Sequence, residues 1–223
     1  MTDATPLKDP SLSDRVYADL KRRLMLGAVR PGQKLSMRKL AAEFGTSPMP
    51  VREALKRLAS EQALESEAAK AFHVPDLSPK RAADLFELRA LLEGAAARAA
   101  LPRLTPARLA KLTLINDRLS AHLTTQDAPA YMADNHLFHF TIYRRADNPD
   151  MVFMIEQLWM QTGPSLRLGL ERSTDTAPQW NSEHTPLLAA LRAGDADAAA
   201  RAMQEDIAWG AHFYRRAAGL TGP

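Results

Sequence analysis

The chain has 223 residues, of which 46% are hydrophobic and 25% are charged, and its formal net charge is +3 at pH 7. A chain of this length and hydrophobic content buries a core, which excludes an intrinsically disordered protein. No apolar run approaches the roughly 18 residues of a membrane-spanning helix, and the chain has no cysteine, so membrane spans, disulfides and thiolate ligands are excluded.

The charge is distributed unevenly on the two sides of Pro75, where the turn-like PDLSPK segment begins. Residues 1–75 hold 13 Lys and Arg against 9 Asp and Glu, whereas residues 76–223 hold 16 against 17. A basic segment fits nucleic-acid binding, but it is also common on ordinary solvated surfaces. The start of the chain is mixed in charge rather than basic and then apolar, so we expect a soluble, cytoplasmic protein with no membrane partner.

The first predicted helix covers residues 14–25. Its apolar residues recur every three or four positions, as in an amphipathic helix, and Ser13 stands at the N-cap position. The helix ends in the segment LGAVRPGQKLS, where two glycines and a proline interrupt the pattern.

Two further helices are predicted, joined by a short turn that contains glycine. Ser36 is placed to cap a helix over 37–44, and a third helix begins at Ser47 or Pro48 and ends near Ser60. This third helix is amphipathic and basic on its exposed side. Such a pair is the helix-turn-helix layout, whose second helix enters the major groove of DNA. The spacing alone also fits a plain helical hairpin.

Residues 20–58 resemble the DNA-binding domain of the GntR family of regulators. The shared pattern is LxxxxxxGxxxPGxxLSxRxLAxxFGxSxxPVREALxRL, and PVREALKRL at 50–58 is its most distinctive part. The resemblance implies a winged helix-turn-helix that binds double-stranded operator DNA, with a two-stranded wing over 64–74. Ala71 replaces the glycine that is usual at the wing tip, so the path of the tip is left open.

The resemblance also implies which residues contact DNA. Arg52 is the best candidate for reading a guanine edge, because a planar guanidinium meets O6 and N7 together. A local ion pair of Arg52 with Glu53 or another nearby carboxylate is the alternative interpretation. The contacts implied by the resemblance come from Arg38, Ser47 and Arg52, and phosphate contacts are expected from Lys39, Lys56 and Arg57.

The chain after Ser78 is predicted to be helical nearly to its end. The expected apolar face of the first of these helices is formed by Leu85, Leu88, Leu92, Ala95 and Ala99. Comparable apolar stripes run through 107–123, 129–146, 150–172, 180–193 and 195–217. We therefore expect a mainly α protein: a winged helix-turn-helix over 1–75, a linker over 76–79 and an all-α bundle of six to seven helices over 80–223.

Three fragments of this bundle resemble the FCD ligand-binding domain of the FadR subgroup of GntR regulators. They are LRALLEGAAARAA at 88–100, LFHFTIYRRADNP at 137–149 and EHTPLLAALRAGDADAA at 183–199. The resemblance implies that the protein forms a homodimer and binds an effector in this domain. Two-fold symmetric dimers match operators whose half-sites are one or more DNA turns apart.

Many FCD domains bind a divalent metal through one Asp and three His. Matching that set to this chain implies Asn135, His139, His184 and Asp206 as ligands of Zn²⁺, Ni²⁺ or Mn²⁺. The set keeps two imidazoles and one carboxylate, but an Asn oxygen is a weak neutral ligand and should lower the metal affinity. The alternative is that these residues are hydrogen-bonded polar groups that line a wet cavity.

Arg89 stands where the resemblance implies a ligand-binding arginine that faces the cavity. A guanidinium is suited to clamping a carboxylate, so the expected effector is a small organic acid. The alternative interpretation is a salt bridge between Arg89 and Glu93, four residues later.

The sequence therefore predicts a transcription regulator whose affinity for its operator is controlled by a small carboxylate. A metal-dependent enzyme with His139, His184 and Asp206 as ligands is the first alternative, and it is disfavoured because no carboxylate is evidently placed as a general base. A DNA-binding protein without an effector is the second alternative.

Overall fold

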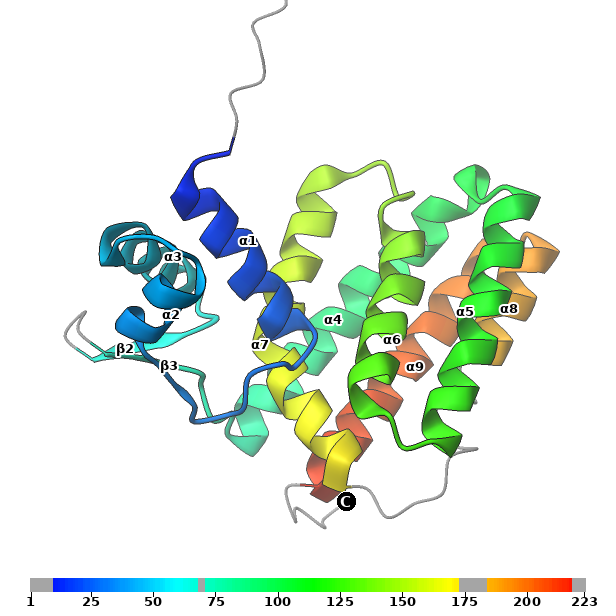
Figure 1. Cartoon of the computed structure of the whole chain (residues 1–223). Coiled ribbons are helices and arrows are strands. Elements are labelled where there is room, and N and C mark those ends of the chain that lie inside the picture. The colour runs from blue at the N-terminus through cyan, green and yellow to red at the C-terminus, as the bar shows by residue number, and fades with distance from the viewer. Residues whose placement is uncertain (1–9, 68–70, 173–183, 218–223) are drawn as a thin grey trace, which may run out of the picture.

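The structure is a computed structural model, and it describes residues 10–67, 71–172 and 184–217. A small N-terminal unit of helices and a short sheet lies against one side of a larger helical bundle (Figure 1). The mainly α-helical fold expected from the sequence is confirmed over these residues. None of the helices in the described ranges is long and apolar enough to cross a membrane.

The N-terminal unit contains three helices, α1 (Leu12–Met25), α2 (Met37–Glu43) and α3 (Pro48–Ser60). The N-cap prediction for α1 was wrong by two residues, because Ser11 and not Ser13 accepts a hydrogen bond, from the amide of Asp14 at 3.1 Å. Ser36 caps α2 as predicted, by accepting from the amide of Lys39 at 3.4 Å.

The wing is one strand larger than the two-stranded wing predicted from the sequence. Strands β1 (Lys34–Leu35), β2 (Glu65–Glu67) and β3 (Ala71–His73) form an antiparallel sheet in the order β1-β3-β2. Phe72 in the central strand is opposite Leu35 on one side and Ser66 on the other, and it is buried. A strand of two residues is too short to show an alternating pattern, so β1 was not predicted.

The bundle contains six α-helices within the described residues. They are α4 (Pro79–Ala100), α5 (Pro106–Thr124), α6 (Ala128–Tyr143), α7 (Pro149–Arg172), α8 (His184–Ala193) and α9 (Ala196–Ala217). A short 3-10 turn over Leu101–Arg103 follows α4. Helices α4 and α9 pack along each other, and α5 and α8 form the far side of the bundle (Figure 1).

The apolar face predicted for α4 was partly wrong. Leu88 is 47% exposed and Ala95 is also exposed, whereas the buried face of α4 includes the charged pair Arg89 and Glu93. A search for apolar residues at helical spacing places the buried face away from such a pair, because it counts charged residues as exposed. In the structure the two opposite charges compensate each other, so both residues can be buried.

Helix α7 lies between the N-terminal unit and the rest of the bundle (Figure 1). It packs against α1 on one side and against α4 and α9 on the other. One buried apolar core includes residues of both parts, such as Leu24 and Trp159. The N-terminal unit therefore rests on the bundle through α7.

Candidate functional site

Helix α6 presents a stripe of polar and aromatic side chains to the interior of the bundle. Tyr131, Asn135, His139 and Tyr143 follow one another at intervals of four residues and are all buried. Side chains four residues apart lie on the same face of a helix. The stripe is therefore one continuous polar surface inside an otherwise apolar core.

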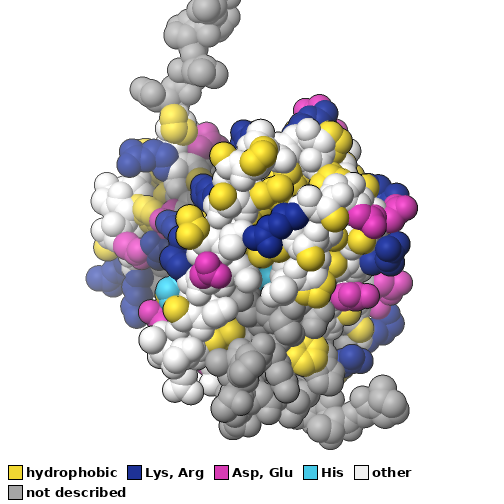
Figure 2. All heavy atoms as spheres, turned by 90° about the vertical axis from the view of Figure 1, so that its right-hand side faces the viewer, with side chains coloured by type: hydrophobic (Ala, Val, Ile, Leu, Met, Phe, Trp, Pro, Cys, Tyr) yellow, Lys and Arg dark blue, Asp and Glu magenta, His cyan; other side chains and the backbone are white. Residues whose placement is uncertain are grey.

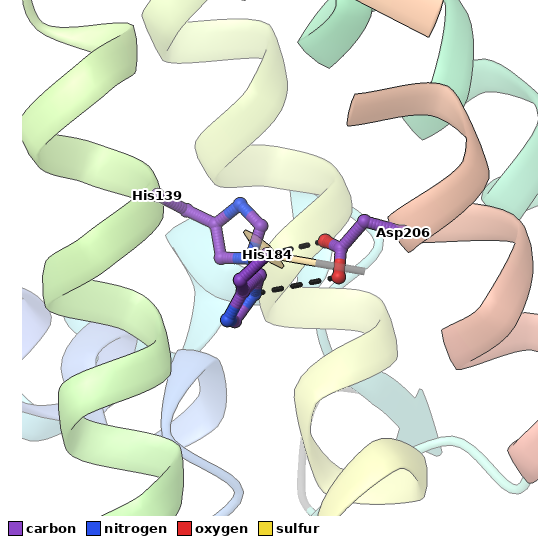
Figure 3. Close-up of side chains that lie close together, drawn as sticks. All are labelled: His139, His184 and Asp206. Atoms are coloured by element: carbon purple, nitrogen blue, oxygen red, sulfur yellow. Dashed lines mark hydrogen bonds and ion pairs between the residues drawn. The ribbon is translucent and has the colours of Figure 1, made fainter. Parts of the chain in front are cut away.

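Two further helices bring a histidine and a carboxylate to this stripe. His139 on α6, His184 at the start of α8 and Asp206 on α9 point toward one another (Figure 3). The Nε2 atoms of both histidines lie 3.3 Å from oxygens of Asp206, and 3.3 Å from each other. Both histidines are 1% exposed and the Asp206 side chain is 10% exposed, so three potential ligands converge at a largely buried place.

Both imidazoles are neutral because burial disfavours their charged form. Burial lowers the pKa of His184 to about 3 and the pKa of His139 well below its usual value, and in His139 the nearby His184 and Arg89 add to the effect. A neutral imidazole offers a lone pair to a metal ion without losing a proton first.

Hydrogen bonding also fixes which nitrogen of His139 carries the proton. The Tyr143 hydroxyl donates to Glu93, and its oxygen lies 2.8 Å from Nδ1 of His139. The phenol oxygen therefore accepts from an Nδ1–H group, which leaves the lone pair of Nε2 directed at His184 and Asp206. This outer hydrogen bond is typical of histidines that bind metals.

The donor set fits a divalent cation. Zinc bonds to nitrogen and oxygen are about 2.0–2.2 Å long, so tetrahedral ligand atoms are separated by about 3.3 Å. The three distances among His139, His184 and Asp206 match that separation. No other group of three or more His, Cys, Asp or Glu residues within the described ranges has this arrangement.

A small cavity of about 40 Å³ opens beside these residues. It is lined by Arg89, Tyr131, Asn135, His139 and Asp206 together with apolar side chains of α4, α7 and α9. A volume of this size holds about three water molecules, and pockets for larger organic ligands are typically about 300–1,000 Å³. The cavity thus fits an ion with a few ligand atoms.

Arg89 reaches this cavity and also forms the salt bridge that the sequence left as an alternative. Its Nε donates to Glu93 at 2.7 Å and one terminal nitrogen donates to Thr162 at 3.2 Å. Glu93 also accepts from Trp159 at 3.0 Å and from Tyr143. The buried carboxylate therefore accepts hydrogen bonds from three residues, and Arg89 is also one of the residues that line the cavity.

Asn135 is the fourth residue implied as a ligand. It lies one turn before His139 on α6 and lines the same cavity. The residues implied as ligands thus lie around one cavity, and metal binding by them stays a prediction.

The residues expected to contact DNA lie on the exposed side of the N-terminal unit. Arg38, Lys39, Ser47, Arg52 and Lys56 are all exposed, and Ser47 makes no capping bond through its hydroxyl. Within the described part of the chain, the four basic residues form no ion pair, so the alternative pair of Arg52 with Glu53 is not formed.

Arg57 is placed differently from the other expected contacts. Its guanidinium lies over the ring of Tyr17, 3.7 Å from the centroid, and it pairs with Glu61 at 3.3 Å and Asp14 at 3.7 Å. It therefore links α3 to α1, and its contact with phosphate stays a prediction.

Sequence reasoning missed the polar residues that support the site. Tyr131 and Tyr143 stand four residues before Asn135 and four after His139, which is a signal that the sequence contains. Trp159 and Thr162 gave no such signal, because their contacts with Glu93 and Arg89 join helices that are far apart in the chain.

Two family models match the chain. Residues 12–74 match the model described as bacterial regulatory proteins of the gntR family, and residues 84–208 match the FCD domain. The cavity residues from Phe86 to Ile207 belong to the second match, and the exposed basic residues belong to the first.

Several known proteins are similar over most of the chain. The HTH-type transcriptional regulator McbR of Escherichia coli is 37% identical over 207 residues, which cover 91% of this chain and 94% of the relative. The gluconate operon transcriptional repressor of Bacillus subtilis is 28% identical, over 85% of this chain and 79% of the relative. The galactonate operon transcriptional repressor of Escherichia coli is also 28% identical, with coverages of 88% and 93%.

Solved structures agree with these relatives. The structure of Escherichia coli McbR/YncC has a TM-score of 0.84 and 34% identity, and the match covers 92% of this chain and 98% of that one. A transcriptional regulator of the GntR type from Rhodococcus has a TM-score of 0.72 over 94% and 99% of the two chains. Its identity of 18% shows a shared fold alone.

Proposed function

The chain belongs to the GntR family of bacterial regulatory proteins and has an FCD domain behind the DNA reader, and from this premise we propose how its buried site is used. The protein is a DNA-binding transcription regulator and not an enzyme. We propose that a small organic acid, bound beside a divalent metal in the cavity of the bundle, changes its affinity for operator DNA.

The convergence of His139, His184 and Asp206 beside Arg89 is the observation that carries this proposal. A cation there would be held by the Nε2 atoms of the two histidines and a carboxylate oxygen of Asp206. When bound, it supplies positive charge and open coordination positions for an oxygen ligand. Zn²⁺, Ni²⁺ and Mn²⁺ are the candidates, since imidazole and carboxylate ligands accept all three.

The net charge of the cavity favours a bound anion only when a metal ion is also bound there. Arg89 and Glu93 compensate each other, which leaves Asp206 as a net negative charge in the cavity. A divalent cation reverses that sign, and the guanidinium of Arg89 then adds a fork of donors for a carboxylate. Two relatives are named for the gluconate and galactonate operons, and both names are those of acids.

On the DNA side, we propose that Arg52 reads a base edge and that Arg38, Lys39, Ser47 and Lys56 hold the backbone. A homodimer would present two readers to two half-sites, in the cytoplasm where the operator lies. We assign the reader to residues 1–75, the linker to 76–79 and the sensor to 80–223; Ser78 and Pro79 begin α4 at this junction.

Elemental analysis of the purified protein tests this proposal, together with melting temperatures in the presence of Zn²⁺, Ni²⁺, Mn²⁺ and small carboxylates. A bound metal and acid should raise the melting temperature of the wild type, because ligands of the folded state stabilise it. His139→Ala should lose both responses, and His73→Ala, on the wing, should keep them. Responses that survive in His139→Ala would contradict the metal site.

A further inference from the structure

Two consecutive residues of α7, Thr162 and Gly163, contact the helical bundle and the DNA reader, respectively. The Thr162 hydroxyl accepts a hydrogen bond from Arg89 at the cavity, at 3.2 Å. Gly163 lies against the end of α1, where a Cβ at this position would overlap the carbonyl oxygen of Leu24 and lie 2.7 Å from that of Met25. One turn of α7 therefore touches both the DNA reader and Arg89, a residue that lines the cavity.

The contact at Gly163 is between backbones. The added Cβ would meet main-chain oxygens of α1, and a Cβ at Gly27, just after α1, would lie 2.7 Å from the carbonyl oxygen of Gly163. Backbone groups cannot rotate away as side chains do, so a shift of α7 at this point must be followed by α1.

Polar contacts on both sides of Gly163 tie the reader to the same helix. Lys21 on α1 pairs with Glu156 at 2.6 Å, and Arg30 pairs with Glu171 near the end of α7. Arg81 at the start of α4 donates to Gln62 after α3, at 2.9 Å, and to Gln161 on α7, at 2.8 Å. The reader is thus attached to α7 along much of its length.

A buried chain of hydrogen bonds links the proposed metal ligand His139 to α7. Nδ1 of His139 donates to Tyr143, Tyr143 donates to Glu93, and Glu93 also accepts from Trp159 on α7 and from Arg89. Arg89 in turn donates to Thr162. Every side chain in this chain of bonds is almost fully buried, so no solvent competes for its partners.

We propose that α7 transmits the occupancy of the cavity to the DNA reader, with Thr162 and Gly163 as the positioning residues. The inference rests on the proposed function and adds the route between its two sites. A ligand on Nε2 of His139 holds the imidazole ring in place, and Nδ1 of that ring is the first group of the hydrogen-bond chain. An acid at Arg89 competes with Thr162 for the guanidinium.

The sequence of α7 makes this point of the helix able to move. Pro164 follows Gly163 inside the helix and has no N–H group, so α7 lacks one internal hydrogen bond at this level. The small cavity also requires movement, because an acid of more than a few atoms enters only if lining groups such as Arg89 shift.

Hydrogen–deuterium exchange of the full chain with and without Zn²⁺ tests this inference. Zinc should slow amide exchange in α6 and α9, where two of its three ligands lie, and also over residues 22–27 at the end of α1. We expect at least about a fivefold effect at 22–27, the lower end of typical coupling between sites. Because Zn²⁺ is the probe, neither the operator nor the acid has to be known.

Thr162→Val removes the hydroxyl that Arg89 donates to and keeps the size of the side chain. It should keep the zinc response of α6 and α9 and lose the response of residues 22–27. Thr113→Val is the matched control, because Thr113 also accepts from an arginine, Arg192 at 2.6 Å, and donates to a carbonyl one turn earlier, but on α5. It should respond as the wild type does.

Gly163→Ala gives a second test that does not depend on Thr162. The added Cβ should separate α1 from α7, so residues 22–27 should exchange faster without zinc and should no longer respond to it. A wild-type response in both variants would overturn the inference, and so would zinc protection of α6 and α9 without any change at 22–27. A lack of zinc protection anywhere would overturn the metal site and the coupling together.

Discussion

Glu93 is the residue on which the buried polar network depends. It is fully buried and accepts from Arg89, Trp159 and Tyr143, which are 2%, 1% and 0% exposed. An ion pair in such a place contributes little by itself, because the desolvation of both charges offsets their attraction. Removing one partner is costly, because the other charge stays buried without compensation.

We expect Glu93→Gln to lower the free energy of unfolding by about 3–5 kcal/mol, the typical cost of breaking a buried pair. Urea unfolding at pH 7 measures this, with Glu87→Gln on the exposed side of α4 as the control. A loss below about 1 kcal/mol would mean that Arg89 finds another partner or reaches water.

Arg52 and Arg57 lie on the same helix and should respond differently to truncation. Arg52 is exposed and free of ion pairs in the described part of the chain, so Arg52→Ala should leave the free energy of unfolding within about 0.5 kcal/mol. On DNA selected by the wild-type protein from a random library, Arg52→Ala should lose about 1–3 kcal/mol of binding free energy. Its sequence preference should also be relaxed at one base pair.

Arg57→Ala should instead lower the free energy of unfolding. The guanidinium stacks on Tyr17 while half of the side chain is exposed, so we expect a loss of about 0.5–1 kcal/mol. Urea unfolding of both variants makes the comparison, with each serving as the control for the other. An Arg57→Ala protein that is fully stable but has lost most of its DNA affinity would favour the phosphate contact.

At the scale of elements, most helix boundaries could be predicted from the sequence, because caps and breakers are local. Ser36 and Pro48 mark the starts of α2 and α3 in the sequence as in the structure. Ser11 and Ser13 are both good caps, and only the structure decides between them. Strand β1 depends on pairing with β3, far along the chain, which no local pattern contains.

The candidate site could be predicted only where one helix or the family resemblance supplied its residues. His139, His184, Asp206 and Arg89 came from the resemblance, and the structure places all of them near one cavity. The side chains that hydrogen-bond to these residues are brought together by the packing of α4, α6 and α7, which no local pattern contains. The exposed Leu88 shows the same limit, since burial of a charged pair overrides the apolar pattern.

Gly163 in α7 and Gly210 in α9 should respond in opposite ways to alanine. A Cβ at Gly210 would lie 3.5 Å from Phe86, an ordinary contact, so Gly210→Ala should gain up to about 1 kcal/mol from helix propensity. Gly163→Ala should lose about 1–3 kcal/mol, because its Cβ overlaps the backbone of α1. Urea unfolding compares them, and equal effects would contradict the close approach.

At the scale of the molecule, the basic excess lies in the reader, while the sensor has nearly equal numbers of acidic and basic residues. On the face of the bundle that carries α5 and α8, acidic and basic side chains are interspersed (Figure 2). DNA attraction should therefore come from the N-terminal unit, through the release of counterions from phosphates.

Salt dependence measures which lysines contact phosphate. Lys56→Ala should weaken DNA binding about equally for all sequences and reduce the slope of log affinity against log salt by about 1. Lys80→Ala removes the same charge from the start of α4, where it pairs with Asp84, and should leave the slope unchanged. Equal slopes for Lys56→Ala and the wild type would mean that Lys56 does not contact phosphate.

The backbone contact at Gly163 has a consequence for building hybrid regulators. A chimera that exchanges residues 1–75 follows the boundary in sequence, but it also replaces the α1 surface that fits Gly163 and pairs with Glu156. A chimera that exchanges only residues 34–74 keeps α1 with its own sensor and still changes the recognition helix and wing. The second design gives the better biosensor, because new DNA specificity is joined to an unaltered contact between α1 and α7.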